Sequence, residues 1–358
     1  MPLGTAFFIV LMNNFELIDK LYEKHTLGVD EYEFLLENRS PDSARYITEK
    51  AVEIRENIYG KKIFIRGLIE ISNICKNDCF YCGIRKSNAD CSRYRLSPDE
   101  IIECCKNGYS LGFRTFVLQG GEDGFFTDDV LCGIVAKIKK LFPDCAVTLS
   151  LGERTLESYE KLKNAGADRY LLRHEAVNGK LYSELHPDNM SLKNRLSCLD
   201  NLRKTGYQVG CGFMVGAPYQ TNRHIAEDLK YIENFKPDMC GIGPFIPHKD
   251  TPFREYNGGS VELTCFLLSV IRLIHPPILL PSTTALGTIS PDGREKGLLS
   301  GANVVMPNLS PQSAREKYEL YDNKLNTGAE NAYHLNELRE KISSIGYETV
   351  TERGDIKL

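Results

Sequence analysis

The sequence lacks a cluster of positive charge. Its 358 residues include 44 Lys and Arg against 48 Asp and Glu, which gives a net charge of −4 at pH 7. The basic residues are dispersed along the chain, without a basic run. Nucleic acids and anionic membrane surfaces are bound through such runs. We therefore expect neither nucleic acid nor a membrane as a partner.

The sequence begins with an apolar stretch that is too short to cross a membrane. Residues 1–11, "MPLGTAFFIVL", lack the length of a transmembrane helix and the basic region and cleavage site of an export signal. We interpret them as an extension that the fold does not need, or as the product of a start codon placed before the true start at Met12. A membrane or export role is the alternative.

Histidine is absent between His25 and His174, and cysteine is absent after Cys265. The 12 cysteines are scattered through the chain rather than placed at the spacing of a small disulfide framework. This distribution is typical of a reducing compartment, where a buried Cys acts as a small apolar side chain. We therefore expect a cytoplasmic protein.

The pattern of apolar residues predicts helices first and then alternating strands and helices. Ser40 and Pro41 are typical of a helix start and Gly60 of a helix end, with apolar residues at steps of three and four between them. After Gly60, short apolar runs alternate with helical stretches such as 97–112 and 221–235. The predicted strands are residues 63–71, 115–119, 146–150, 169–173, 208–215, 239–243, 277–281 and 303–307.

Strands that alternate with helices in this way predict an α/β protein. Near-continuous apolar strands indicate a parallel sheet covered on both faces, and eight repeats match a complete (β/α)8 TIM barrel. An open doubly wound sheet is the alternative, but the first strand is not followed by the G-x-G-x-x-G turn of dinucleotide-binding folds. We expect an N-terminal helical extension in residues 1–59, the barrel in 60–310, and a C-terminal helical tail in 311–358 with its helix within 332–346.

The stretch "CKNDCFYC" directly follows the first predicted strand and contains Cys75, Cys79 and Cys82. The loop after a barrel strand lies at the mouth where active sites of this fold are built. Three thiolates can bind three irons of a 4Fe-4S cluster, which normally takes four Cys, so one iron stays open to another ligand. A zinc site is an alternative, although the usual fourth Cys or His at short spacing is absent. Chance spacing in a cysteine-rich chain is a second alternative.

The stretch "DRYLLRHEAVN" places charged residues on a strand that is otherwise apolar. Arg169, Arg173 and Glu175 need partners or ligands there, because isolated buried charges are costly. Arginine donates paired hydrogen bonds in a fixed geometry, which favours recognition of a carboxylate. A structural network of ion pairs is the alternative. Hydroxyl groups at the end of the third strand and an arginine on the helix after the fourth strand add polar groups near the mouth, namely Thr148, Ser150 and Arg195.

The cysteine spacing, with Tyr81 before the last Cys, resembles the signature of the radical S-adenosylmethionine (SAM) superfamily. In that superfamily the open iron binds the amino and carboxylate groups of SAM, and one electron splits SAM into methionine and a 5′-deoxyadenosyl radical. "LQGGED" (118–123) looks like the segment that meets the amino group of SAM, with a simple strand-to-helix turn as the alternative. "GIGPFIP" (241–247) resembles the segment that packs against the adenine, with a glycine-rich buried strand as the alternative.

Five further stretches, "LLRHE", "MVGAP", "GIGPFIPH", "TTALGTI" and "GANVVMPN", together resemble the FeFe-hydrogenase maturase HydE family over roughly residues 40–321. Biotin synthase and methylornithine synthase are near relatives of that family. The resemblance implies three groups of site residues. The cluster would be held by Cys75, Cys79 and Cys82. SAM would be bound by or near Tyr81, Gly120, Glu122, Thr148, Ser150, Glu175 and Arg195. The substrate would be contacted by Arg169, Arg173, Thr283, Thr284 and Tyr318.

The resemblance also implies a substrate and partners. The substrate would be an organometallic unit, a low-spin iron that carries CO, cyanide and cysteine, whose sulfur the radical attacks. An electron donor such as ferredoxin or flavodoxin and the other hydrogenase maturases would be partners. Because no Cys follows Cys265, we expect one 4Fe-4S cluster only, which also weakens a biotin synthase assignment. The alternatives are a radical SAM enzyme of another substrate, such as a mutase or a sulfur-inserting synthase, and a non-enzymatic iron–sulfur or zinc carrier.

Overall fold

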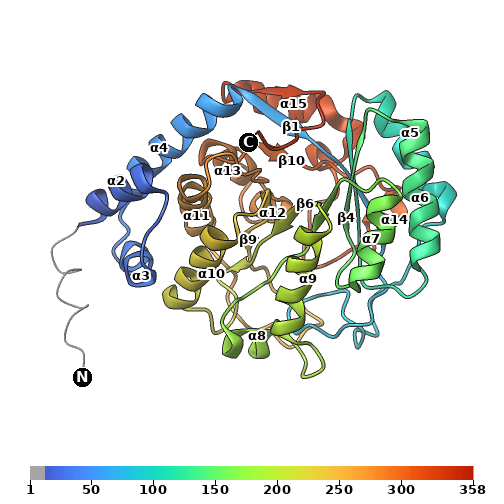
Figure 1. Ribbon diagram of the computed structural model, residues 1–358, viewed down its shortest axis with the longest axis horizontal. Coiled ribbons are helices and arrows are strands. Elements are labelled where there is room, and N and C mark those ends of the chain that lie inside the picture. The colour runs from blue at the N-terminus through green and yellow to red at the C-terminus, as the bar shows by residue number, and fades with distance from the viewer. Residues whose placement is uncertain (1–12, 358) are drawn as a thin grey trace.

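The computed structural model describes residues 13–357, so the apolar stretch 1–11 lies outside the described residues. Three helices come first: α2 (Asn14–Lys24), α3 (Val29–Glu37) and α4 (Pro41–Tyr59). Helix α4 begins as predicted, because the hydroxyl of Ser40 accepts the backbone N–H of Ser43. It ends at Gly60, whose φ of 63° favours glycine. These helices lie at one side of the molecule (Figure 1), where α3 packs on α10 (Asn222–Phe235) and α4 on α11 (Val261–Ile274).

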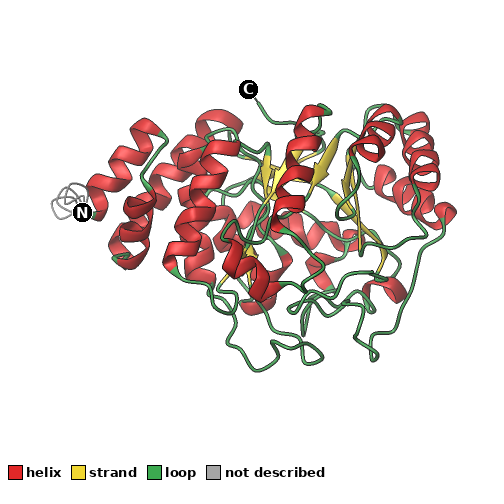
Figure 2. Ribbon diagram, turned by 60° about the horizontal axis from the view of Figure 1, so that its bottom comes forward, coloured by secondary structure: helices red, strands yellow, loops and turns green. Residues whose placement is uncertain are grey.

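A six-stranded parallel sheet forms the centre of the molecule and confirms the predicted α/β class. Its strands, in spatial order, are β2 (Gly67–Ser72), β3 (Thr115–Gly120), β4 (Ala146–Ser150), β5 (Arg169–Leu171), β6 (Gln208–Cys211) and β8 (Met239–Cys240). Helices alternate with these strands and surround them (Figure 2). Besides α10 and α11 they are α5 (Pro98–Ser110), α6 (Asp128–Leu141), α7 (Leu156–Asn164), α8 (Gly179–Leu185), α9 (Leu192–Lys204), α12 (Thr284–Ile289) and α13 (Gly293–Leu299).

Several predicted strands are shorter than expected or divided. Residues 63–71 form two strands in different sheets, β1 (Lys62–Ile65) and β2, which are interrupted at Arg66. Residues 208–215 and 239–243 likewise divide, and their second parts pair with each other as β7 (Met214–Val215) and β9 (Gly243–Pro244). The division has a local cause at Gly212, which has a φ of 149° and where a Cβ would lie 2.1 Å from the carbonyl oxygen of Gly241. The two chain segments approach too closely there for any residue but glycine.

The last two predicted strands are the least regular. Residues 277–281 form no strand in the described structure, and only single bridges join Met239 to Leu279 and Pro281 to Val304. Residues 303–307 contain the short strand β10 (Val304–Val305), which pairs with β1. The structure therefore shows a parallel α/β fold but does not confirm a complete closed barrel of regular strands.

The C-terminal segment contains more than the predicted helix. It has the short helix α14 (Gln312–Arg315), two single 3-10 turns (Gly328–Glu330 and Ala332–His334) and α15 (Leu335–Ser344), which lies within the predicted range. Strand β11 (Glu348–Val350), which was not predicted, follows this helix and pairs in parallel with β1. The end of the chain is thereby joined to the start of the barrel region.

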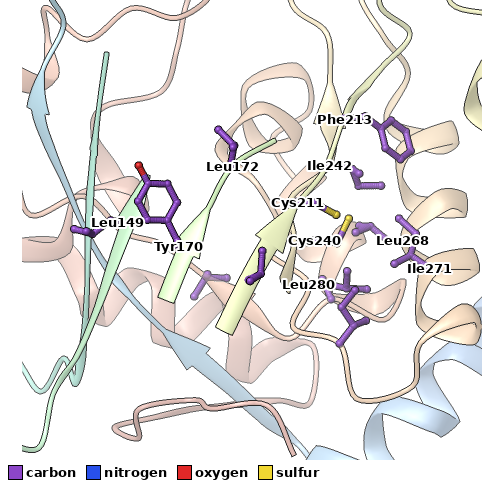
Figure 3. Close-up of a cluster of buried hydrophobic side chains, with 14 of the residues drawn as sticks. Leu149, Tyr170, Leu172, Cys211, Phe213, Cys240, Ile242, Leu268, Ile271 and Leu280 are labelled. Atoms are coloured by element: carbon purple, nitrogen blue, oxygen red, sulfur yellow. The ribbon is translucent and has the colours of Figure 1, made fainter. Parts of the chain in front are cut away.

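The core lies between the sheet and its helices. Cys211 and Cys240 are neighbours on β6 and β8 and are fully buried. Figure 3 shows their sulfur atoms among apolar side chains, including Leu268 and Ile271 of α11. Both cysteines are free thiols, as the prediction of small apolar core residues requires. None of the helices in residues 13–357 is long and apolar enough to cross a membrane.

Candidate active site

A cavity of about 360 Å³ opens at the carboxyl ends of the central strands. It is lined by the loop after β2, the ends of β3 to β5, the start of α12 and the segment 318–324. All but two of the predicted site residues line it. They are Cys75, Cys79, Tyr81, Cys82, Gly120, Glu122, Ser150, Arg173, Glu175, Arg195, Thr283, Thr284 and Tyr318.

The three motif cysteines are free thiols on an irregular loop and are partly exposed to the cavity. Burial raises the pKa of Cys75, and it raises the pKa of Cys79 to about 12. Binding of iron reverses this effect, because a coordinated thiol loses its proton. No three His, Cys, Asp or Glu side chains in residues 13–357 converge where one metal ion could bind them. Thiols that each bind a different iron of a cluster need not converge, so the donor set fits a cluster.

Two side chains that sequence reasoning missed fix this loop. Arg93 donates to the carbonyl oxygens of Asn73, Ile84 and Arg85 at 2.6–2.8 Å. Asp78, inside the motif, accepts from Arg85 at 2.7 Å, and this contact holds the pKa of its carboxyl well below the usual range. A long loop has no periodicity that would mark such residues in the sequence.

Tyr81 is fixed on the other side of the motif by His186. The Nδ1–H of His186 donates to the carbonyl oxygen of Tyr182 at 2.9 Å, which leaves Nε2 as the acceptor of the Tyr81 hydroxyl at 3.3 Å. Burial lowers the pKa of His186 to about 4, so the ring is neutral at pH 7. The aromatic ring before Cys82 therefore has one orientation at the cavity wall.

The glycines after β3 let the cysteine loop approach this strand. A Cβ on Gly121 would lie 2.3 Å from the carbonyl oxygen of Ile74, next to the first motif cysteine. The neighbouring Glu122 donates its N–H to the sulfur of Cys75 at 3.4 Å. Its carboxylate pairs with Lys76 at 3.0 Å. The glycines of this segment thus let its backbone approach the cysteine loop closely.

Charged groups from β5 and α9 form a network beside the cysteines. Glu175 has a φ of 64°, a left-handed conformation that is strained for a residue with a side chain and is typical of functional sites. Its Oε2 lies 3.2 Å from Nη2 of Arg173. Arg195 donates to Glu153 at 2.6 Å and to the backbone oxygen of Arg173 at 2.8 Å. Burial opposes the charge of Arg195, but Tyr182 and Glu153 more than offset it and raise its pKa.

Unpartnered polar atoms in this part of the cavity indicate a ligand site. Within residues 13–357, neither Nε of Arg173 nor Oγ1 of Thr283 has a hydrogen-bond partner, although both are buried. Thr284 differs, because its hydroxyl donates to Glu330 at 2.8 Å. The hydroxyl of Tyr318 accepts from Gln119 at 3.4 Å. Buried donors without partners are costly, so a ligand with acceptor oxygens would stabilise the site.

Comparison with known proteins gives the family. Residues 69–232 match the model of the radical SAM superfamily. The chain is 48% identical over 275 residues to the [FeFe] hydrogenase maturase subunit HydE of Thermotoga maritima, which covers 77% of this chain and 78% of that protein. The chain belongs to the HydE family. It is thus a radical SAM enzyme, with a 4Fe-4S cluster and SAM as the cofactors that this family uses.

More distant relatives share the fold of this HydE family member. The 3-methylornithine synthase of Methanosarcina acetivorans is 28% identical over 86% of this chain and 87% of its own length. The crystal structure of methylornithine synthase (PylB) matches with a TM-score of 0.80 at 23% identity, over 93% of this chain and 97% of that one. The structure of HydG, a maturase of the [FeFe]-hydrogenase, has a TM-score of 0.80 at 21% identity, over 96% and 78% of the two chains. These structural matches establish the fold.

Arg169 does not line the cavity of this HydE family member, contrary to expectation. It is the first residue of β5, four residues before Arg173, which follows the strand. At that end of the strand its guanidinium donates to Gln208 at 3.0 Å and to Asp355 at 2.6 Å. The two arginines of the charged stretch therefore serve opposite ends of the fold.

Thr148 is the second predicted residue outside the cavity lining. It precedes Ser150 by two positions on β4, so both side chains lie on one face of the strand. Thr148 is buried one layer deeper, at the register of Arg169. The hydroxyl of Thr148 thus lies in the middle of β4 rather than at its end, where it was predicted.

Among the charged residues that line the cavity, Glu70 and Lys324 were not predicted. Glu70 lies in the middle of β2 and in register with Gln119, which is in turn in register with Ser150. A charged residue inside the run "LIEIS" is a signal that could have identified Glu70. Lys324 comes from the irregular segment after α14, where the sequence offers no pattern that places a side chain.

Proposed function

We propose that this HydE family member reductively cleaves SAM and acts in the assembly of the diiron active site of FeFe-hydrogenase. Its substrate would be an iron carbonyl and cyanide unit bound to cysteine, and its fold a complete (β/α)8 barrel closed through the single bridges at 279–281. One observation supports this most strongly. The unpartnered donors of Arg173 and Thr283 share one cavity with the three motif thiols. The 48% identity to the HydE protein of Thermotoga maritima supports the choice of reaction.

The cofactors would be held at the mouth of this cavity. Cys75, Cys79 and Cys82 would bind the cluster, and the cluster with SAM supplies a 5′-deoxyadenosyl radical when an electron donor such as ferredoxin or flavodoxin reduces it. The chain positions these groups and excludes water, as proteins around radical cofactors do. The residues proposed to contact SAM are Tyr81, Gly120, Glu122, Ser150, Glu175 and Arg195.

The substrate would lie deeper, where the chain provides hydrogen-bond donors. Arg173 and Thr283 would bind its carboxylate, since an arginine and a hydroxyl together satisfy both carboxylate oxygens. Thr284 would join them on release from Glu330. The buried ring of Tyr318 would close the remaining side. A carboxylate held in this way fixes the sulfur of the same cysteine in one position relative to the radical.

Two assays on anaerobically reconstituted protein test the proposal. The first measures 5′-deoxyadenosine formed from SAM in the presence of dithionite. The second measures activation of an apo-hydrogenase by the other maturases with and without this chain. We expect both to be positive. Cleavage of SAM without activation of the hydrogenase would overturn the maturase function and leave a radical SAM enzyme of another substrate, such as a mutase or a sulfur-inserting synthase.

A further inference from the structure

Glu70 is a buried carboxylate of the cavity lining to which the proposed function gives no role. Its side chain is 0% exposed and points to the cavity side of β2, together with that of Leu68. One carboxylate oxygen, Oε1, accepts from Nζ of Lys324 at 2.6 Å. The other, Oε2, is buried and has no hydrogen-bond partner among residues 13–357.

Lys324 does not satisfy the second oxygen because its own position is fixed. Its Nζ also donates to the backbone oxygen of Tyr318 at 3.0 Å and lies 4.9 Å from the centre of the Tyr318 ring. The side chain of Lys324 is 8% exposed, so the pair is shielded from water. A purely structural role is the alternative explanation, in which the ion pair holds the segment 318–324 against β2. That role accounts for Oε1 but leaves Oε2 a buried acceptor without a donor, on a residue that lines the cavity.

Unpartnered polar atoms lie on two walls of the cavity. On one wall Arg173 has an unpartnered donor, Thr283 an unpartnered hydroxyl and Glu175 an unpartnered oxygen 3.2 Å from Arg173. Glu175 is a proposed SAM contact, so the acceptor that remains without an assigned ligand is that of Glu70 on the other wall. Glu70 lies on β2 and Arg173 follows β5, and the strands β3 and β4 separate them in the sheet. A ligand that satisfies both walls carries an anionic group at one end and an N–H donor at the other. An amino acid or its derivative has this chemistry.

We propose that Glu70 is a specificity-determining residue that accepts a hydrogen bond from the amino nitrogen of an amino-acid substrate. This inference rests on the proposed function, because it assumes that Arg173 and Thr283 bind the carboxylate of that substrate. It adds that the substrate must also present an N–H donor. A charged acceptor that is buried and otherwise unpartnered discriminates strongly against a ligand that lacks the donor.

The test compares two probes on the reconstituted holoenzyme with SAM bound. L-Cysteine and 3-mercaptopropionate share a carboxylate and a thiol, and only L-cysteine has an amino group. We expect calorimetric titration to show that the unmodified protein binds L-cysteine about tenfold more tightly or better. Equal affinity for the two probes would overturn the proposal without the need for any variant.

Glu70→Gln separates recognition from the structural role. The amide oxygen of Gln can still accept from Lys324, but its NH2 group replaces the acceptor Oε2 with a donor. We expect the preference for L-cysteine to fall to about one in this variant, by the loss of the same hydrogen bond. Retained preference in a folded Glu70→Gln protein would show that Glu70 only anchors Lys324. Activation of the hydrogenase is measured separately, so failure of the proposed function is distinguishable from failure of this proposal.

Discussion

Arg169 and Asp355 join the start of strand β5 to the last residues of the chain. The guanidinium of Arg169 donates to Asp355 at 2.6 Å and to the backbone oxygen of Arg353 at 2.8 Å. Its side chain is 0% exposed, whereas that of Asp355 is 38% exposed. The sequence suggested Arg169 as a substrate contact, but its guanidinium N–H groups donate to groups of the protein itself. We assign it a role in stability.

Replacing Arg169 by Met should lower the stability of the protein and leave its chemistry intact. The expected loss is about 1–3 kcal/mol, the usual worth of hydrogen bonds to charged groups, and the exposure of Asp355 keeps it toward the lower end. Urea unfolding measures it. Cleavage of SAM should stay unchanged. A folded Arg169→Met protein that loses activation of the hydrogenase but keeps its stability would return Arg169 to the substrate site. Asp355→Asn is the matched control. Because the two residues form one ion pair, the stability lost in the double variant should be less than the sum of the losses in the single variants.

Replacing Cys79 by Ala should abolish SAM cleavage without unfolding the protein. Cys79 lies on an irregular loop at the cavity and contributes little to the core. Iron content, the visible absorption of the cluster and the yield of 5′-deoxyadenosine measure the outcome. Cys91 is a control from the same loop, since it is a free thiol outside the cavity lining, and Cys91→Ala should keep all three. A Cys79→Ala protein with both cluster and turnover would show that this thiol is not a ligand.

Replacing Gly121 by Ala should impair the cluster site through backbone contact. The added Cβ would lie 2.3 Å from the carbonyl oxygen of Ile74 and 2.8 Å from Cβ of Cys75, so the cysteine loop must shift. We expect reduced iron loading at nearly normal thermal stability. Gly124→Ala is the matched control, because a Cβ there meets nothing within 4 Å among the described residues. Equal loading of the two variants would mean that the loop tolerates the shift.

The sequence predicted the α/β class and most residues of the cavity lining, but not how deep in the fold each residue lies. The cysteine spacing and the stretches after each strand pointed to residues that line one cavity, because side chains at the carboxyl ends of parallel strands lie close together. It could not separate Arg169 from Arg173. Arg169 begins β5 and Arg173 follows it, and which of the two reaches the cavity depends on where the strand lies in the sheet register.

Residues that reach the cavity from irregular segments were beyond prediction. Lys324 meets Glu70 from 254 positions away, and no local pattern encodes such a contact. Strand β11 was missed for a related reason. It is only 3 residues long and partly exposed, and it forms because its backbone pairs with the edge of β1. Tertiary pairing outweighs local propensity in such short strands.

Replacing Arg173 by Gln should separate radical generation from substrate use. Its Nε is unpartnered within the described chain, and its guanidinium is one of the two donors proposed for the carboxylate. We expect activation of the hydrogenase to fall about tenfold to a hundredfold, the worth of a charged hydrogen bond. The rate of SAM cleavage without substrate should fall much less. Equal losses in the two assays would place Arg173 at SAM instead. That outcome is a real alternative, because Arg173 lies 3.2 Å from Glu175, which is itself a proposed SAM contact.

Acid should destabilise the protein through His275, which follows α11 far from the cysteine loop. Burial, together with the charges of Lys236 and Arg272, lowers the pKa of His275 from 6.5 to about 4. The unfolded chain therefore binds a proton between these values that the folded chain does not. Stability from this group is complete above pH 6.5, falls as the pH drops, and is lost by about pH 4, a change of up to about 3 kcal/mol. Urea unfolding at pH 7 and pH 4.5 should show a smaller decline for His275→Gln than for the unmodified protein. Parallel declines would mean that His275 is protonated in the folded state.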